Sequence, residues 1–294
     1  MTDETFGTKH LYTAVQLSLE HFHRESNLKR SGVGTGFILV SAKSGSAYLV
    51  TNRHLTDLPY ADHKGYGYQL GGIAISGYSQ HTRCLDADVV HQTHLVDQPV
   101  CAYPADDSVD VCVVSLGEAS LLPGFNTMGV HALASGDAFR NGTVHVGSQV
   151  LTPGYPSFNK ELADRPILVI GTVSSDPRYD AVMGSHVYSN RVLCQSFSRA
   201  GMSGSPVMAI APAATSFWGE QSIQVVGLNT GHVSFDDPTI INGPPSVLTL
   251  FTPATEIAAV IHSFEGEGDP ISTDDITSPI SASPPTSSAR ETGL

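Results

Sequence analysis

The feature that most constrains the fold of this chain is a succession of short apolar runs, each bounded by Gly, Pro, Ser, Asn or Asp. Runs of this kind are typical of β-strands, and no helices alternate with them. The 28 glycines, 18 prolines and low charged content of 15% also favour many turns. We therefore predict an all-β protein, a barrel or a sandwich. The predicted strands lie at 34–55 (a hairpin), 72–78, 86–96, 109–117, 143–156, 165–175, 185–197, 204–211, 223–233 and 246–254.

Two short helices are predicted at the ends of this region. Residues 252–264 predict a C-terminal helix, with Thr252 as its cap and Pro253 at the first helical position. Residues 9–22 predict an N-terminal helix. Its apolar residues have a roughly helical distribution: Leu11, Val15, Leu17, Leu19 and Phe22.

The segment 265–294 has no aromatic residue and is rich in Ser, Thr, Pro and Asp. Such a segment cannot bury enough apolar surface to offset its ordering entropy, so we predict that it is disordered. The expected organisation is an N-terminal helical segment (1–29), one large domain (30–264) and a disordered tail (265–294).

The chain has 15 basic and 28 acidic residues, a formal net charge of −13 at pH 7. This charge repels phosphate backbones and anionic membrane surfaces, so we expect neither nucleic acid nor membrane as a partner. The first residues are acidic and their apolar pattern is interrupted, which fits neither a secretory signal nor a transmembrane segment. The expected location is therefore cytoplasmic.

No metal or other cofactor is expected. Histidine pairs occur at His21 and His23 and at His91 and His94, but neither pair has a third ligand at a recognisable spacing. We interpret them as surface histidines. The cysteines form no Cys-x-x-Cys pair, and in a reducing compartment we expect four free, buried thiols: Cys84, Cys101, Cys112 and Cys194.

The stretch "SRAGMSGSPV" (198–207) places two glycines around Ser203 at the start of a predicted strand. Taken alone, it is typical of a tight turn, because Gly tolerates backbone angles that other residues avoid. A second interpretation is a nucleophile on a sharply bent loop. A serine hydroxyl needs an imidazole to take its proton and a carboxylate to orient that imidazole, so this interpretation depends on the rest of the chain.

Suitable partners stand at two other strand ends. "AYLVTNRHL" ends an apolar strand with His54, and "DSVDVCVVSLG" opens another with Asp110. Each alone also fits a polar surface residue or a turn residue. Together with Ser203 they supply the three groups that nucleophilic catalysis by serine requires.

Other carboxylates compete for the role of the acid. Asp106 and Asp107 lie just upstream of Asp110, and Asp86 and Asp88 lie farther back. Asp110 is preferred because it stands at the mouth of a near-continuous apolar strand, where a carboxylate would be buried and able to hold an imidazole. We interpret Asp106 and Asp107 as a solvated loop pair.

With these residues identified, the chain resembles the chymotrypsin-fold (trypsin-like) serine peptidases, of the bacterial type related to the HtrA peptidases. The resemblance covers roughly residues 30–262, and its most specific element is Gly-x-Ser-Gly-Ser-Pro. The matching segments are "GTGFIL" (34–39), "LVTNRH" (49–54), "VDVCVV" (109–114), "GYP" (154–156), "GTVS" (171–174), "GMSGSPV" (201–207) and "VVGLNTG" (225–231).

The resemblance implies two six-stranded antiparallel barrels with the active site in the cleft between them. It implies His54 as general base and acid, Asp110 as its orienting carboxylate and Ser203 as nucleophile. The amides of Gly201 and Ser203 would form the oxyanion hole.

Substrate-binding residues are implied in the same way. They are Phe197, Asn229, Thr230, Gly231 and His232. No carboxylate stands at the expected base of the primary pocket, and Asn229 stands where glutamate-selective relatives have His. We therefore expect an uncharged P1 residue, small or apolar, and a substrate that pairs with residues 230–232 as an added strand.

The chain departs from the family at two motif positions and at its start. Met202 replaces the usual Asp or Asn, Ser205 replaces a Gly, and no "IVGG"-type start released by cleavage is present. Neither substitution removes a catalytic group. Regulation is expected from the N-terminal helix, the tail or a regulatory protein partner.

The expected function is a serine endopeptidase that cleaves protein or peptide substrates through an acyl-enzyme on Ser203. An α/β-hydrolase esterase also uses Ser, His and an acid, but it requires Gly-x-Ser-x-Gly and the order Ser, Asp, His. Here position 205 is Ser and the order is reversed. A second alternative is a non-catalytic peptidase-fold module that binds extended peptides.

Overall fold

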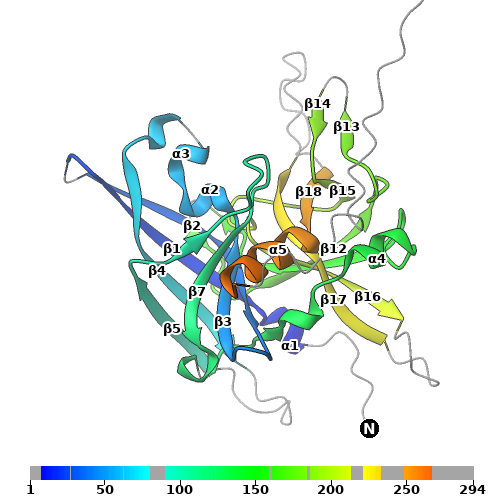
Figure 1. Cartoon of the computed structure of the whole chain (residues 1–294), viewed down its shortest axis with the longest axis horizontal. Helices are drawn as coiled ribbons and strands as arrows, with labels where there is room; N and C mark the ends of the chain where they lie inside the picture. Colours follow the sequence, from blue (N-terminus) through cyan, green and yellow to red (C-terminus); the bar gives the residue numbers. More distant parts are fainter. Residues whose placement is uncertain are drawn as a thin grey trace, which may run out of the picture.

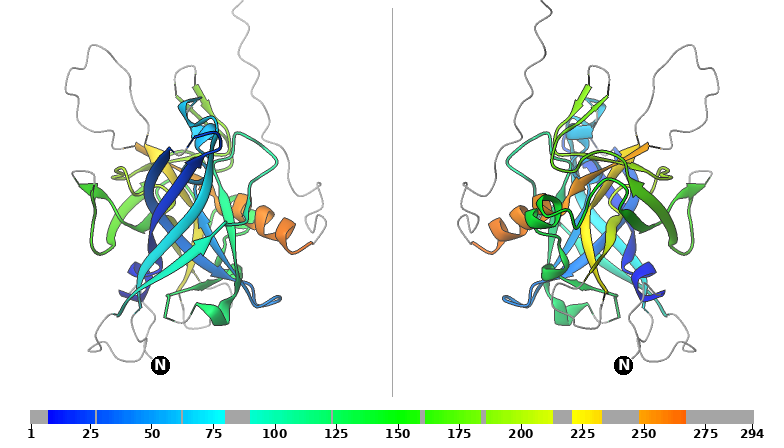
Figure 2. Two further views of the ribbon diagram at one scale, coloured as in Figure 1. Left: turned by 90° about the vertical axis from the view of Figure 1, so that its left-hand side faces the viewer. Right: turned by 90° about the vertical axis from the view of Figure 1, so that its right-hand side faces the viewer.

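Strands dominate the structure and form two groups, one from each half of the sequence (Figures 1 and 2). The computed structural model describes residues 8–26, 28–61, 63–79, 90–122, 124–158, 161–183, 186–212, 221–232 and 248–266. In chain order the first half has α1 (Thr8–Leu11), β1 (Ala14–His23), β2 (Lys29–Val40), β3 (Ser46–Thr51), α2 (Arg53–Thr56), α3 (Leu58–Ala61), η1 (His63–Gly65), β4 (Tyr68–Ser79), β5 (Val90–Asp97), β6 (Cys101–Ala102), β7 (Cys112–Glu118), η2 (Ala119–Leu121), β8 (Met128–Gly129) and η3 (Val130–Ala132).

The second half continues with the elements that build the other group of strands and the C-terminal helix. These are α4 (Gly136–Arg140), β9 (Gln149–Gly154), β10 (Ser157–Phe158), β11 (Glu161–Leu162), β12 (Ile167–Val173), β13 (Ala181–Met183), β14 (His186–Tyr188), β15 (Val192–Gln195), β16 (Pro206–Pro212), β17 (Gln221–His232), β18 (Leu248–Pro253) and α5 (Ala254–Phe264).

The two groups differ in how they close. The second is a closed barrel of six antiparallel strands in the order β12-β15-β18-β17-β16-β9. The first is an eight-stranded sheet in the order β5-β4-β1-β2-β3-β7-β6, with β8 pairing in parallel with β2. The all-β prediction and its six-stranded second barrel are confirmed. The first half has eight strands in place of the expected six because β6 and β8, each two residues long, add to the sheet.

The predicted helix over residues 9–22 is wrong. One helical turn, α1, is present, and the residues after it form β1, which lies between β4 and β2 in the sheet. Leu17 and Leu19 are buried while Ser18 and Glu20 are exposed, so the side chains alternate with a period of two. The apolar positions fit a helix loosely, but this alternation is the signal of a strand with one buried face.

The predicted C-terminal helix is present as α5 and begins one residue later than expected. Pro253, not Thr252, occupies the N-cap position, and no side chain caps the helix. Ile257, Val260 and Ile261 are buried, as the pattern indicated. The α5 helix contacts both β7 and β17, so it closes the boundary between the two halves (Figure 1).

One apolar cluster fills each half of the molecule, and another lies between the two halves and holds them together. One fills the first sheet around Leu17 and Ile38, and another fills the second barrel around Phe251. The third lies between the halves and includes Phe37 and Ile257. Because successive β2 side chains enter different clusters, both faces of this strand are covered, and its residues from 34 to 39 are buried without interruption.

The start of the predicted tail is ordered. The Glu265 carboxylate accepts hydrogen bonds from Ser44 Oγ at 3.0 Å and from the Tyr48 hydroxyl at 3.3 Å. These contacts correct the prediction that disorder begins at 265, because a carboxylate that accepts two hydroxyl bonds is held in place. Residues 267–294 lie outside the described residues.

Three of the four cysteines lie in the described part of the chain, and all three are free thiols as predicted. Cys112 and Cys194 are buried, whereas Cys101 is half-buried. Burial raises the pKa of the Cys194 thiol to about 12. Cys84 lies outside the described residues.

In the described part of the chain, no helix is long and apolar enough to span a membrane.

The prediction that His21 is a surface histidine is wrong. It is 1% exposed, on β1, and neither ring nitrogen has a hydrogen-bond partner in the described part of the chain. The backbones of Arg30, Leu55 and Thr56 lie close to the ring, and burial lowers the pKa of His21 below its ordinary value. His21 is therefore a neutral side chain that packs against the backbone of α2.

We predict that His21 makes folding stability depend on pH. The ordinary histidine pKa of about 6.5 applies in the unfolded chain, which therefore binds more protons than the folded protein just below that pH. Stability should be complete above this pH and decrease as the pH falls toward the lower pKa of the folded state. Thermal unfolding of wild type and His21→Met at about pH 7.5 and about pH 5.5 tests this. His91→Gln, at an exposed histidine on β5, is the control. Equal pH dependence of wild type and His21→Met would contradict the prediction.

Candidate active site

His54 and Asp110 meet where two strands of the first sheet end. His54 lies on α2, directly after β3, and Asp110 lies two residues before β7. Asp110 Oδ2 is 2.8 Å from His54 Nδ1, and the His54 backbone N–H donates to Asp110 Oδ1 at 2.9 Å. Asp110 is only 7% exposed. A buried carboxylate that holds both the ring and the backbone of a histidine fixes the ring orientation.

Asn52 supports this pair and was not identified from the sequence. Its side chain is buried, and Nδ2 donates to the Asp110 carbonyl oxygen at 2.8 Å. Asn52 precedes α2 in the position of an N-cap, but its side chain makes no capping bond. The amide is used to join the end of β3 to the backbone of Asp110. The place of Asn52 at the end of an apolar run, two residues before His54, is the sequence signal that could have pointed to it.

Further charged and polar groups surround Asp110. The Tyr60 hydroxyl and the Arg191 guanidinium both interact electrostatically with its carboxylate. Burial raises the pKa of Tyr60, and the charge of Asp110 raises it further. Tyr60 is therefore a neutral hydroxyl at physiological pH.

The loop that carries Ser203 connects β15 to β16 and is bent at two glycines. Gly201 has φ +91° and Gly204 has φ +88°, values that other residues rarely adopt. A Cβ at Gly201 would overlap the Tyr155 carbonyl oxygen, and one at Gly204 would overlap the Thr35 carbonyl oxygen. Glycine is therefore required at both positions for conformation and for space.

Two carbonyl groups of this loop, those of Ala200 and Met202, accept hydrogen bonds from residues of the second half. Ala200 O accepts from the Ser157 N–H at 2.7 Å. Met202 O accepts from the Ser205 N–H at 3.1 Å and from Asn229 Nδ2 at 2.8 Å. In a trans peptide the next N–H points the opposite way, so the amides of Gly201 and Ser203 face away from these partners. Neither amide donates to a backbone carbonyl in the described part of the chain.

Thr35, on β2, joins this loop to the first sheet. Its hydroxyl donates to the Gly201 carbonyl oxygen at 2.7 Å and accepts from the Tyr155 N–H at 3.0 Å. Its backbone N–H donates to the Ser203 carbonyl oxygen at 2.9 Å. Thr35 is fully buried and was not identified as a site residue from the sequence, where it is one residue of the quoted "GTGFIL" motif.

Gly34, on β2, lies close to both Leu55 and the backbone of Ser203. A Cβ at Gly34 would overlap the side chain of Leu55, the residue after His54, and would be 3.4 Å from the Ser203 carbonyl oxygen. Both Ser203 and His54 are partly exposed. No hydrogen bond joins the Ser203 hydroxyl to His54 among the described residues. Such a bond is often long without substrate and shortens when substrate binds.

The residues expected to bind substrate lie around this loop. Phe197 is 42% exposed, and the Arg199 guanidinium lies 5.5 Å from its ring centroid. Asn229 is buried and donates to Ser198 Oγ at 3.3 Å as well as to Met202. Asn229 therefore holds the loop that it was expected to border.

The edge of β17 beside the Ser203 loop is left without a strand partner. β17 pairs with β16 only as far as Leu228, and with β18 from Gly227 to His232. Thr230 Oγ1 donates to the Leu250 carbonyl oxygen at 3.1 Å, on the β18 side. In the described part of the chain, no strand pairs with residues 230–232 on the other side. The side chain of His232 lies outside the described residues.

Of the competing carboxylates, the two in the described part of the chain, Asp106 and Asp107, make no hydrogen bond to His54. Asp106 and Asp107 are exposed, as predicted for a loop pair, and Asp107 bonds to Arg53 rather than to His54. Asp86 and Asp88 lie outside the described residues.

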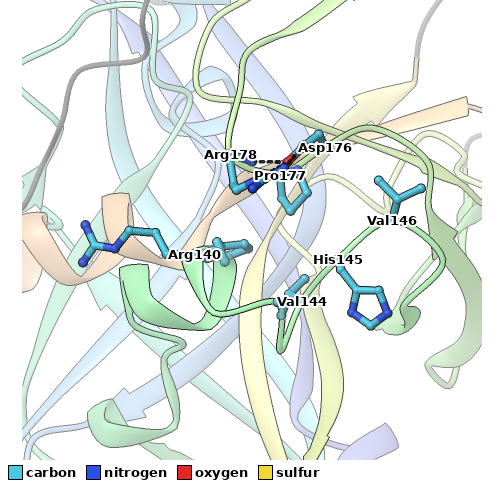
Figure 3. Close-up of a pocket in the computed structure, with 9 residues that line it drawn as sticks. Arg140, Val144, His145, Val146, Asp176, Pro177 and Arg178 are labelled. Atoms are coloured by element: carbon cyan, nitrogen blue, oxygen red, sulfur yellow. Dashed lines mark hydrogen bonds and ion pairs between the residues drawn. The ribbon is translucent and has the colours of Figure 1, made fainter.

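A separate surface cavity of about 380 Å³ lies beside α4, at the second barrel (Figure 3). Arg178 at its rim is paired with Asp176 at 2.6 Å, so these two charges neutralise each other. His145 is bonded through Nδ1 to Ser148 Oγ at 3.0 Å. The cavity shares no residue with the predicted site.

The close approach at Gly204 yields a prediction. Alanine is strained by about 1–2 kcal/mol at such a φ, and at position 204 it must also displace the Thr35 carbonyl. Gly204→Ala should therefore destabilise the protein by about 1–3 kcal/mol more than a Gly→Ala substitution at a positive φ where the added Cβ meets no neighbouring atom. Gly117→Ala is the matched control, since Gly117 has φ +77° and nothing within 4 Å of its Cβ. Urea unfolding measures both, and equal losses would contradict the prediction.

Comparisons with known proteins show which family the sequence matches. A family model described as "Trypsin-like peptidase domain" matches residues 34–211. Among solved structures, that of Deg5 has a TM-score of 0.48 at 16% identity, covering 86% of this chain and 88% of that chain. The Rv3671c protease from M. tuberculosis in its active form has a TM-score of 0.48 at 15% identity, covering 90% of this chain and 85% of that chain. A search of curated proteins found no match.

Proposed function

Because the chain belongs to the trypsin-like peptidase family, we propose that it is a serine endopeptidase that hydrolyses peptide bonds of protein substrates through an acyl-enzyme on Ser203. The observation that carries the proposal is the hold of Asp110 on His54, at 2.8 Å to the ring and 2.9 Å to the backbone. With the proton of the ring on Nδ1, next to Asp110, Nε2 is free to accept a proton from a nucleophile.

In the first half of the reaction, the Ser203 hydroxyl adds to the scissile carbonyl while its proton moves to His54 Nε2. Asp110 stabilises the imidazolium that forms. The tetrahedral intermediate collapses when His54 donates this proton to the leaving amine. An ester between Ser203 Oγ and the acyl part of the substrate remains.

The negative charge on the carbonyl oxygen needs preorganised donors. The amides of Gly201 and Ser203 are suited to this role, because the carbonyls on the other side of their peptide bonds are fixed to Ser157, Ser205 and Asn229. A donor fixed in this way requires no rearrangement when charge develops, and one such donor is worth about 10²–10³ in rate.

In the second half, His54 takes a proton from water, the resulting hydroxide equivalent adds to the ester carbonyl, and the proton returns to Ser203 as the acid product leaves. The same amides receive the oxygen charge again. The enzyme is thus restored without a cofactor.

The open edge of β17 supports an extended peptide as the substrate. Residues 230–232 have a strand partner on one side only within the described chain, so a peptide can pair with the other side as an added antiparallel strand. This places the substrate backbone beside the Ser203 loop. We propose protein substrates for this reason.

A second candidate function is a non-catalytic module that grasps extended peptides. The observation in its favour is that no hydrogen bond links Ser203 Oγ to His54 in the described residues. The same β17 edge would hold the peptide. The two candidates differ in whether the Ser203 hydroxyl is activated.

The first prediction from this function concerns two of the proposed catalytic residues, Ser203 and His54. Ser203→Ala or His54→Ala should each lower kcat by on the order of 10⁴-fold or more, and the double variant should lose little beyond that, since the two residues act as one unit. A peptide ester substrate and a serine-directed phosphonylating probe measure activity. Ser205→Ala is the matched control, because its hydroxyl is buried without a partner in the described chain.

The outcomes separate the two candidates. Probe labelling that disappears in Ser203→Ala and persists in Ser205→Ala supports the peptidase. A wild-type protein that binds an extended peptide, resists the probe and does not hydrolyse the ester is the binding module.

A further prediction concerns the P1 residue. Asn229 of the proposed primary pocket is neutral, and its amide is engaged by Met202 and Ser198, so this residue offers no charge to pair with a substrate side chain. We expect small or apolar P1 residues to be cleaved fastest in a peptide library. A strong preference for Arg, Lys or Glu would be incompatible with this assignment.

A further inference from the structure

The segment that delivers Asp110 is an exposed loop for most of its length. Residues 105–108 are exposed, and Val109 is the first buried residue before Asp110. Within the loop, the Asp106 carboxylate accepts from the Ser108 N–H at 2.8 Å. Asp110 itself stands between the buried Val109 and Val111, and Asn52 bonds to its carbonyl oxygen. The exposed residues 105–108 have no such anchors, so the groups that contact them from outside hold the segment that leads to Asp110.

Arg53 holds this loop from the first half of the molecule. Its side chain is 15% exposed and forks to two carboxylates, with Nε 3.0 Å from Asp57 and NH1 2.8 Å from Asp107. The guanidinium also lies 4.5 Å from the ring centroid of Tyr60 and 4.8 Å from that of Tyr103. Because Arg53 directly precedes His54 on α2, it ties the histidine and the Asp110 loop to one another.

Arg191 holds the same loop from the second half. It lies directly before β15, and its NH2 donates to the Ser108 carbonyl oxygen at 3.0 Å. The neighbouring Asn190 side chain donates to the Asp106 carboxylate at 3.4 Å. Arg191 is half-buried, and the groups that interact with its charge are Asp110, Tyr60, Glu256 and Asp106.

From these contacts we infer that Arg53 and Arg191 are positioning residues for the proposed catalytic acid. They clamp residues 106–110 from the two halves of the molecule and so keep Asp110 against His54. The inference rests on the proposed function, since the consequence of the clamp is the orientation of His54 as a general base. Neither arginine reaches a reacting atom, and both act through Asp110.

The two arginines are not equivalent. Arg53 uses the planar fork of its guanidinium, which lysine cannot reproduce, whereas Arg191 contributes one hydrogen bond to a carbonyl and a charge. Arg191→Lys should therefore recover most of the activity that Arg191→Gln loses, and Arg53→Lys should recover little of the loss in Arg53→Gln.

The kinetic test compares these four variants with wild type on a peptide ester. A misplacement of the acid by a fraction of an ångström to an ångström lowers kcat by about 10- to 100-fold and leaves KM nearly unchanged, because substrate contacts are elsewhere. In the Asp110→Asn background, the glutamine variants should cause no further loss, since they act through Asp110. The matched control is Arg178→Gln, an exposed arginine paired with Asp176.

The spectroscopic test needs no catalytic activity. The proton between His54 Nδ1 and Asp110 Oδ2 gives a far-downfield proton NMR signal when the bond is ordered. We expect this signal in wild type and Arg178→Gln, a broadened or lost signal in Arg53→Gln and Arg191→Gln, and none in Asp110→Asn. Asp107→Asn provides a second way to weaken the clamp at an exposed side chain, and it should broaden the signal as well.

Each outcome separates this inference from the proposed function. Folded glutamine variants that keep both the NMR signal and the wild-type kcat overturn the clamp but leave the peptidase intact. If wild type does not react with the serine-directed probe, the peptidase proposal fails, and the NMR signal still decides whether the arginines position Asp110. If the glutamine variants unfold, an unchanged signal in Asp107→Asn overturns the role of Arg53. For Arg191 the variant is then Arg191→Met, which keeps an apolar stem but has neither the charge nor the hydrogen bond to Ser108, and an unchanged signal and kcat in it overturn the role of Arg191.

Discussion

The site depends on one buried threonine. Thr35 joins three segments that are far apart in the sequence: its hydroxyl bonds to the Gly201 carbonyl and the Tyr155 amide, and its N–H bonds to the Ser203 carbonyl. These bonds fix the Ser203 loop of the second half to a strand of the first half. Since a buried hydroxyl that both donates and accepts tolerates little displacement, the distance between Ser203 and the His54 strand is set by Thr35 and not by the loop itself.

The same arrangement explains the apolar architecture. β2 is buried on both faces because one face fills the first sheet and the other fills the cluster between the halves. α5 then covers this cluster by contacting β7 and β17. Because β2 belongs both to the first sheet and to the interface, it fixes the position of the second half relative to the first sheet. The two halves therefore form one rigid frame around His54 and Ser203, instead of two domains joined by a linker.

The sequence predicted the parts of the site that stand at strand ends. His54, Asp110 and Ser203 each follow or precede a strong apolar run, so a short motif places them. It could not predict the contacts made between distant segments, such as Thr35 with Gly201 or Arg191 with Ser108, because nothing local distinguishes these residues. The error in β1 has another cause. The apolar residues of β1 alternate in the sequence, but the same positions also match a helix loosely, and pairing with two neighbouring strands decides the conformation.

The hydrogen bonds of the Ser203 loop also have a temporal consequence. Asn229 supplies a side-chain bond to Met202 and two backbone bonds to Gly204 and Ser205. It lies 26 residues after Ser203 in the chain, on a strand that is itself flanked by β18. The strands of the first sheet all end by Gly129, so during synthesis they can pair before Asn229 is reached. The Ser203 loop cannot take its final shape until Asn229 has left the ribosome. A nascent chain can therefore hold His54 against Asp110 well before it holds Ser203 in place.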